Sequence, residues 1–129
     1  MNSRTSRLVL ALSAFVFTIG GLLHAWAFRG AEAAIGRANL PSIYARDFKA
    51  LWLADSTTLL TVAAFFVVAA LRPAASSKTL LLLVSVIPAA TAVLIYVFVG
   101  NFYAGHLLLG AAAAGALAAA IPRKRDASC

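Results

Sequence analysis

Three ionisable side chains interrupt the long apolar stretches of this sequence: His24, Asp55 and His106. Ionisable groups are costly in hydrocarbon, so they are candidates for function wherever a segment spans a membrane. Imidazole and carboxylate groups suit zinc, copper or iron, and two histidines at one level could hold a haem between helices. The same side chains could bind the polar head of a small amphiphile, change charge near neutral pH, or simply bond one helix to another.

The composition indicates a membrane protein. Of the 129 residues, 63% are hydrophobic and 12% are charged, and the mean hydropathy is +0.93. Soluble domains are about one quarter charged, so this much apolar surface requires a bilayer as its solvent. The net charge of +7 comes from residues that flank the apolar runs without interleaved aromatics. This pattern indicates anionic lipid head groups as the partner and excludes nucleic acid. The single cysteine, Cys129, gives no disulfide, redox or metal signal.

Four apolar segments have the length needed to cross a membrane, about 20 residues at 1.5 Å per residue for ~30 Å of hydrocarbon. They run approximately over residues 8–28, 50–71, 79–99 and 102–121. The strand-like alternation of a membrane β-barrel is absent from the sequence. We therefore predict an all-α fold, an antiparallel four-helix transmembrane bundle that forms one membrane domain over residues 1–129.

The connections between the segments set the order of the bundle. Short polar turns separate the second, third and fourth segments, whereas residues 29–49 form one long connection, predicted as a loop on the outer side. Within this connection Leu40-Pro41-Ser42 resembles a helix start, with Ser42 as N-cap. The second helix is therefore expected to begin outside the membrane.

The distribution of Lys and Arg predicts the orientation. Four basic residues lie on the side of the long loop, and seven lie on the other side: Arg4, Arg7, Arg72, Lys78, Arg123, Lys124 and Arg125. The positive-inside rule then places both termini in the cytoplasm of a bacterial cell, as a multi-pass protein of the inner membrane. An alternative is that residues 1–27 form a signal peptide cleaved after Ala25-Trp26-Ala27.

Helix rise predicts that the three ionisable side chains share one depth. His24, Asp55 and His106 each lie about 6–7.5 Å inside the outer boundary of their segments, at 1.5 Å per residue. In an up-down bundle the first helix contacts the second and the fourth, so His24 is expected to meet both other residues. The outer half also holds further polar or amphipathic side chains, which complete a candidate ligand-binding pocket: Trp52, Thr58, Tyr96 and Asn101. If a metal binds, its ligands are expected to be His24, His106 and Asp55.

Other motifs add little chemistry. Pro88, in the middle of the third segment, predicts a kink, and transporters use broken helices at binding sites. The sequence contains no nucleophile elbow, P-loop or dinucleotide fingerprint, so catalysis is unsupported and no cofactor is indicated.

Gly20-Gly21-Leu22-Leu23-His24, together with Leu51-Trp52 and Ser56-Thr57, resembles sequences of small four-helix bacterial membrane proteins. The layout is similar to that of the DoxX-like proteins, a resemblance that implies a fold and no site residue. Small multidrug transporters share the length and helix count, but they rely on a membrane-embedded glutamate in the first helix, and the first apolar segment of this chain, residues 8–28, has no acid.

These observations together predict a non-enzymatic integral membrane protein. Its outer polar pocket is expected to bind a small amphiphile or a partner membrane protein, with a homo-oligomer as one form of partner. The alternatives are a metal- or haem-binding membrane protein and a small transporter working as an oligomer.

Overall fold

The computed structural model describes residues 3–72 and 76–120, which form four helices and no strand. They are α1 (Ser3–Arg37), α2 (Ser42–Leu71), α3 (Lys78–Phe98) and α4 (Tyr103–Ala120). Each helix is long and apolar enough to cross a membrane, so the predicted all-α class with four membrane-spanning helices is confirmed to that extent. Parts of two predicted features, residues 73–75 of a turn and the basic run 123–125, lie outside the described residues.

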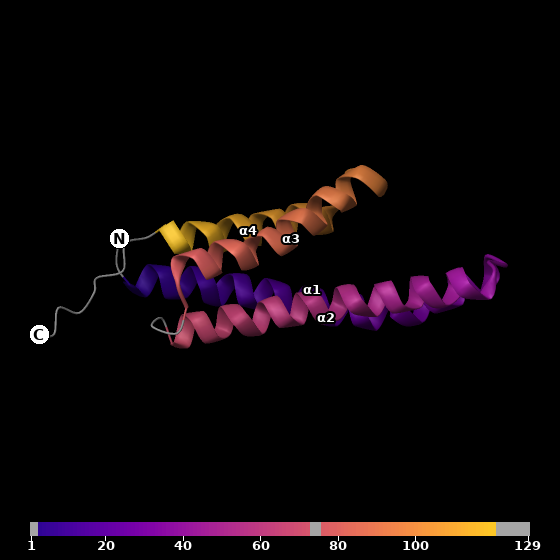
Figure 1. Cartoon of the computed structure of the whole chain (residues 1–129), viewed down its shortest axis with the longest axis horizontal. Helices are drawn as coiled ribbons and strands as arrows, with labels where there is room; N and C mark the ends of the chain where they lie inside the picture. Colours follow the sequence, from indigo (N-terminus) through magenta and orange to yellow (C-terminus); the bar gives the residue numbers. More distant parts are fainter. Residues whose placement is uncertain (1–2, 73–75, 121–129) are drawn as a thin grey trace, which may run out of the picture.

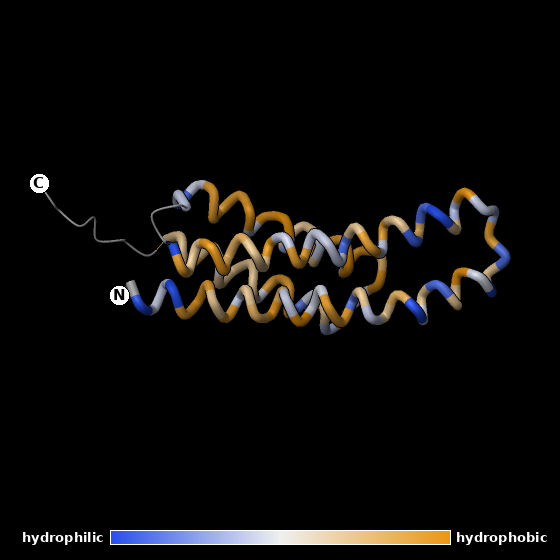
Figure 2. Tube along the Cα trace, turned by 90° about the horizontal axis from the view of Figure 1, so that it is seen from below, coloured by the Kyte–Doolittle hydropathy of each residue, from blue (hydrophilic) through white to orange (hydrophobic). Residues whose placement is uncertain are grey.

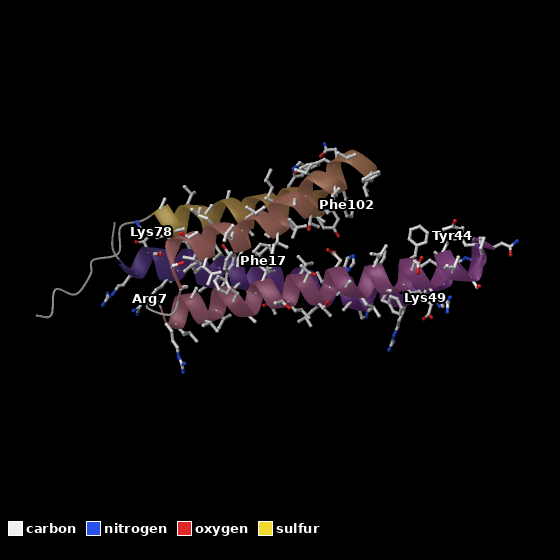
Figure 3. The ribbon with its side chains drawn as sticks, in the orientation of Figure 1. Arg7, Phe17, Tyr44, Lys49, Lys78 and Phe102 are labelled. Atoms are coloured by element: carbon white, nitrogen blue, oxygen red, sulfur yellow. The ribbon has the colours of Figure 1, made fainter. Side chains whose placement is uncertain are left out.

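The helices pack as two pairs joined along one seam. α1 lies beside α2 over a long distance, α3 lies beside α4, and α1 also packs against α4 (Figure 1). α2 and α3 are consecutive in the chain, but they do not form one of these three main interfaces. The start of α1, the end of α2, the start of α3 and the end of α4 lie at one end of the molecule (Figure 1). Arg7 and Lys78 are found at this end (Figure 3).

The interior of the bundle is built from aromatic side chains set against small residues. Phe17 of α1 and Phe66 of α2 are fully buried with ring centroids 5.7 Å apart, and Figure 3 shows Phe17 within the bundle. A Cβ at Gly115 of α4 would lie 2.7 Å from Phe66 and 2.8 Å from Ser85 Oγ. A Cβ at Gly21 would lie 2.9 Å from the side chain of Leu60. Small residues at these positions let backbones approach closely, which is how membrane helices commonly pack.

Most large apolar side chains point outward. Phe98, Trp26 and Leu71 are 81%, 75% and 74% exposed, and many other Leu, Val and Phe side chains are more than half exposed. Such a surface is unfavourable in water and suits hydrocarbon. Pro88 is buried inside α3, which continues as one helix from Lys78 to Phe98.

The long connection over residues 29–49 differs from its prediction as a loop. Only residues 38–41 are non-helical, because α1 continues to Arg37 and α2 begins at Ser42. This segment, here called the projecting hairpin, extends past α3 and α4 and is rich in hydrophilic positions (Figures 1 and 2). Hydropathy indicates where a helix leaves lipid, whereas Ala, Glu and Arg keep it helical beyond that point. Lys49 Nζ and Glu32 Oε1, 2.7 Å apart, form an ion pair between its two helices.

The turn at the tip of the hairpin has recognisable chemistry. Asn39 has a φ of 49°, a left-handed conformation that asparagine tolerates and that commonly ends helices. Pro41 then stands at the N-cap position, with a φ of −50° and a ψ of 140°. The prediction that Ser42 is the N-cap was wrong by one residue. The extended backbone of Pro41 makes Ser42 the first helical residue, and no side chain caps this end.

Candidate functional site

The first polar cluster lies between α1 and α2 and is centred on His24. The His24 ring stacks on the Trp52 indole, with centroids 4.4 Å apart and an angle of 14° between the planes. His24 Nδ1 lies 2.9 Å from Ser56 Oγ, and His24 Nε2 lies 3.6 Å from Asp55 Oδ2. Trp52 Nε1–H donates to the backbone oxygen of His24 at 2.8 Å. Four residues therefore join α1 to α2 at this level.

Ser56 links the His24 ring to the backbone of α2. Ser56 Oγ lies 3.2 Å from the Trp52 carbonyl oxygen and 2.9 Å from His24 Nδ1, so it bridges the two. His24 Nε2 faces the Asp55 carboxylate at 3.6 Å, and both side chains are about one third exposed, at 31% and 35%.

Ser56, His24 and Asp55 are the residue types of a hydrolytic triad, but their arrangement opposes nucleophilic catalysis. Ser56 is only 3% exposed, and its hydroxyl is held between the Trp52 carbonyl and His24. A nucleophile must reach its substrate and pass its proton to the base. We conclude that Ser56 orients His24. Sequence reasoning missed this contact, because the only signal was that Ser56 adjoins Asp55.

The second polar cluster lies between α3 and α4 and is centred on His106. His106 Nδ1 lies 2.8 Å from the Tyr96 hydroxyl, and His106 Nε2 lies 2.6 Å from Asn101 Oδ1. With Nε2–H donating to Asn101 and Nδ1 accepting from Tyr96 O–H, both ring nitrogens are satisfied. In this arrangement the Asn101 amide retains its two Nδ2–H donors.

The seven residues expected to form one pocket are therefore divided. His24, Asp55 and Trp52 come together on one side of the bundle, and a second group comes together on the other: Tyr96, Asn101 and His106. Thr58 donates to the carbonyl of Ala54 within its own helix. No group of three His, Cys, Asp or Glu side chains able to hold a metal is found in residues 3–72 and 76–120. The metal-ligand set considered from the sequence thus does not assemble there.

The packing of α1 on α4 explains why His24 and His106 belong to different clusters. Ser6 Oγ donates to the carbonyl of Ala118 at 3.2 Å, which fixes how the two helices align. Thr18 lies twelve residues after Ser6 in α1, and His106 lies twelve residues before Ala118 in α4, so Thr18 and His106 are level. His24 lies six residues beyond Thr18, about 9 Å further along at 1.5 Å per residue. The assumption of equal depth failed because segment boundaries do not reveal this alignment.

A cavity of about 240 Å³ lies between α1 and α4. α1 contributes Leu12, Ser13 and Val16, and α4 contributes residues between His106 and Ala114. The wall is mostly apolar or small, with His106 at one end. A second hollow of about 270 Å³ lies between α1 and α2, and its one hydroxyl, on Thr18, is bonded to Ala14 at 2.8 Å.

Ser13 is an exception among the buried serines of the described helices. Ser6, Ser56 and Ser85 each donate to a carbonyl. Ser13 is 2% exposed, lines the cavity between α1 and α4, and has no hydrogen-bond partner among the described residues. An unsatisfied buried hydroxyl costs about 1–3 kcal/mol, so this one calls for an explanation.

Comparison of the chain with protein-family models, with curated proteins and with solved structures gave no match.

Proposed function

We propose that this chain is a multi-pass protein of a bacterial inner membrane that binds a small single-chain amphiphile between α1 and α4. In this proposal the four helices form an antiparallel bundle with both termini in the cytoplasm, and the projecting hairpin lies outside. Seven of the eleven basic residues then lie on the cytoplasmic side, in accord with the positive-inside rule.

The cavity between α1 and α4 is the observation that carries the proposal. Leu12 and Leu107 line it and are themselves 66% and 55% exposed, so its rim is open to the surrounding lipid. A hydrocarbon chain can therefore enter sideways from the bilayer. His106 stands at one end of the cavity, where the polar cluster with Tyr96 and Asn101 begins.

The size of the cavity favours a chain over a helix. A volume of about 240 Å³ is enough for part of a hydrocarbon chain, whose remainder can lie in the lipid at the open rim. A partner helix, about 10–12 Å in diameter, would need a groove along its whole length, whereas a single chain needs only this volume. Of the two ligand classes expected from the sequence, the small amphiphile is therefore the better match.

The polar cluster offers a place for the head group. The two Nδ2–H donors of Asn101 suit a carboxylate or another oxygen-rich head, and His106 holds the amide in position through its 2.6 Å bond. The tail would lie along Gly110 and Ala114, where α4 presents almost no side chain. The contacts of His24 and Asp55 then hold α1 against α2 and do not touch the ligand.

Filling the cavity tests the proposal. A Cβ at Gly110 meets nothing within 4 Å, so Gly110→Leu enters the cavity without a backbone clash. Gly20→Leu is the matched control, because Gly20 is equally open and lines neither hollow. Native mass spectrometry of the full chain in detergent, with octadecanoic acid as the probe, measures retained ligand.

We expect Gly110→Leu to lower the affinity about tenfold or more, equivalent to about 1.4 kcal/mol, and Gly20→Leu to leave it unchanged. Equal binding by both variants, or no retention of octadecanoic acid by the unaltered chain, would contradict the proposal.

A further inference from the structure

The buried hydroxyl of Ser13 points to a property of the ligand that an ordinary lipid tail lacks. We propose that the amphiphile carries an oxygen atom part way along its chain, as a ketone, hydroxyl or ether, and that Ser13 hydrogen-bonds to this oxygen. The inference rests on the proposed function, since it concerns the same cavity.

A serine or threonine hydroxyl in a membrane helix usually donates to the backbone carbonyl four residues earlier, and other hydroxyls of this chain do so. Ser85 donates to Leu81, and Thr18 donates to Ala14, at 2.8 Å in each case. Ser13 makes no such bond, although it lies in the same helix as Thr18. Its donor is therefore available to a group outside its own helix, and the space beside it is the cavity.

The alignment of the helices places Ser13 deep in the molecule. Ser13 lies seven residues after Ser6 in α1, and Ala111 lies seven residues before Ala118 in α4. Because Ser6 contacts Ala118, Ser13 is level with Ala111, which also lines the cavity. Ala111 lies near the middle of α4, so this level is far from both ends of that helix. His106 is five residues away along α4, about 7.5 Å at 1.5 Å per residue.

This depth determines the class of group that can satisfy Ser13. Hydrocarbon contains no water to accept the hydrogen bond, and the carbonyls of common lipids lie at the interface. The rest of the cavity wall is aliphatic or small, including Leu12, Val16 and Gly110. An oxygen on the ligand's own chain, about 7.5 Å beyond the level of the head-group cluster, meets the requirement.

A series of oxo-octadecanoic acids, with the ketone at different positions, tests the inference against unsubstituted octadecanoic acid. The readout is the relative affinity for the full chain by native mass spectrometry. We expect one ketone position to bind about five- to tenfold more tightly than the unsubstituted acid, the effect of one buried hydrogen bond. Ser13→Ala removes the donor with little change in volume, so we expect it to abolish the preference and retain the unsubstituted acid.

Two further variants keep the test decisive. Thr18→Val is the matched control, because Thr18 is an α1 hydroxyl that lines the second hollow, and it should keep the preference. Ser13→Cys, with a weaker donor, should reduce the preference if Ser13→Ala fails to fold. If oxo and unsubstituted acids bind alike, or if Ser13→Ala keeps the preference, the inference fails while the proposed function stands. Absence of binding by every acid would overturn both.

Discussion

Replacing Gly115 by alanine tests the packing of three helices at one point. The new Cβ would lie 2.7 Å from Phe66 Cζ and 2.8 Å from Ser85 Oγ, closer than such atoms approach in proteins. Neither neighbour has room to move: Phe66 is 0% exposed, and the Ser85 hydroxyl is tied to Leu81 at 2.8 Å. Overpacking of this kind costs about 1–3 kcal/mol, so Gly115→Ala is expected to destabilise the bundle.

The matched control is Gly110→Ala in the same helix, where a Cβ meets nothing within 4 Å. Both substitutions remove a helical glycine, which favours the folded state by about 0.5–1 kcal/mol, so this contribution cancels in the comparison. The difference in unfolding free energy between the two variants should therefore equal the overpacking cost of about 1–3 kcal/mol. Equilibrium unfolding in mixed micelles, followed by circular dichroism, measures it.

The same experiment offers an internal check. Phe66→Leu shortens the side chain nearest to the new methyl group, so the double variant with Gly115→Ala should be less destabilised than the sum of the two single changes. Equal stability of Gly115→Ala and Gly110→Ala would refute the description of how α2, α3 and α4 meet.

Three smaller predictions follow from single contacts. Ser56→Ala leaves His24 Nδ1 without its hydrogen-bond partner in a partly exposed site, and we expect a loss of about 1 kcal/mol in unfolding free energy; no loss would contradict the importance of this bond. Lys49→Met breaks the ion pair of the projecting hairpin and should cost less than about 1 kcal/mol, diminishing further in high salt. Asn39→Cys, in a chain with Cys129→Ser, should react with a membrane-impermeant maleimide in intact cells, whereas labelling only after permeabilisation would reverse the proposed topology.

Hydropathy was sufficient to predict the four helices but not their ends. Residues 29–37 were predicted as a loop because they are polar, yet they are helical, whereas Leu40-Pro41-Ser42 did indicate a helix start within one residue of the observed one. The hydropathy of residues 29–37 reflects the solvent around them, while their Ala, Glu and Arg content favours a helix in water as well as in lipid. The non-helical stretch is confined to the residues around Asn39 and Pro41, whose backbone preferences interrupt a helix.

The candidate site was harder to predict because it depends on helix alignment. His24 and Asp55 do come together, but the same estimate of depth failed to place His106, which lies level with Thr18. This alignment depends on contacts such as Ser6 with Ala118, which no property of a single segment reveals. One feature of the sequence could have drawn attention to Ser13, because it is the only polar residue between Leu8 and Phe17.

The measurement that tests the binding claim most directly is photo-crosslinking with a diazirine-bearing fatty acid, followed by peptide mapping of the full chain in lipid nanodiscs. A ligand between α1 and α4 should give crosslinks concentrated at residues 12–16 and 106–114, and excess octadecanoic acid should suppress them. Crosslinks spread over the lipid-facing surfaces of all four helices, with no enrichment at the cavity and no competition, would contradict the account.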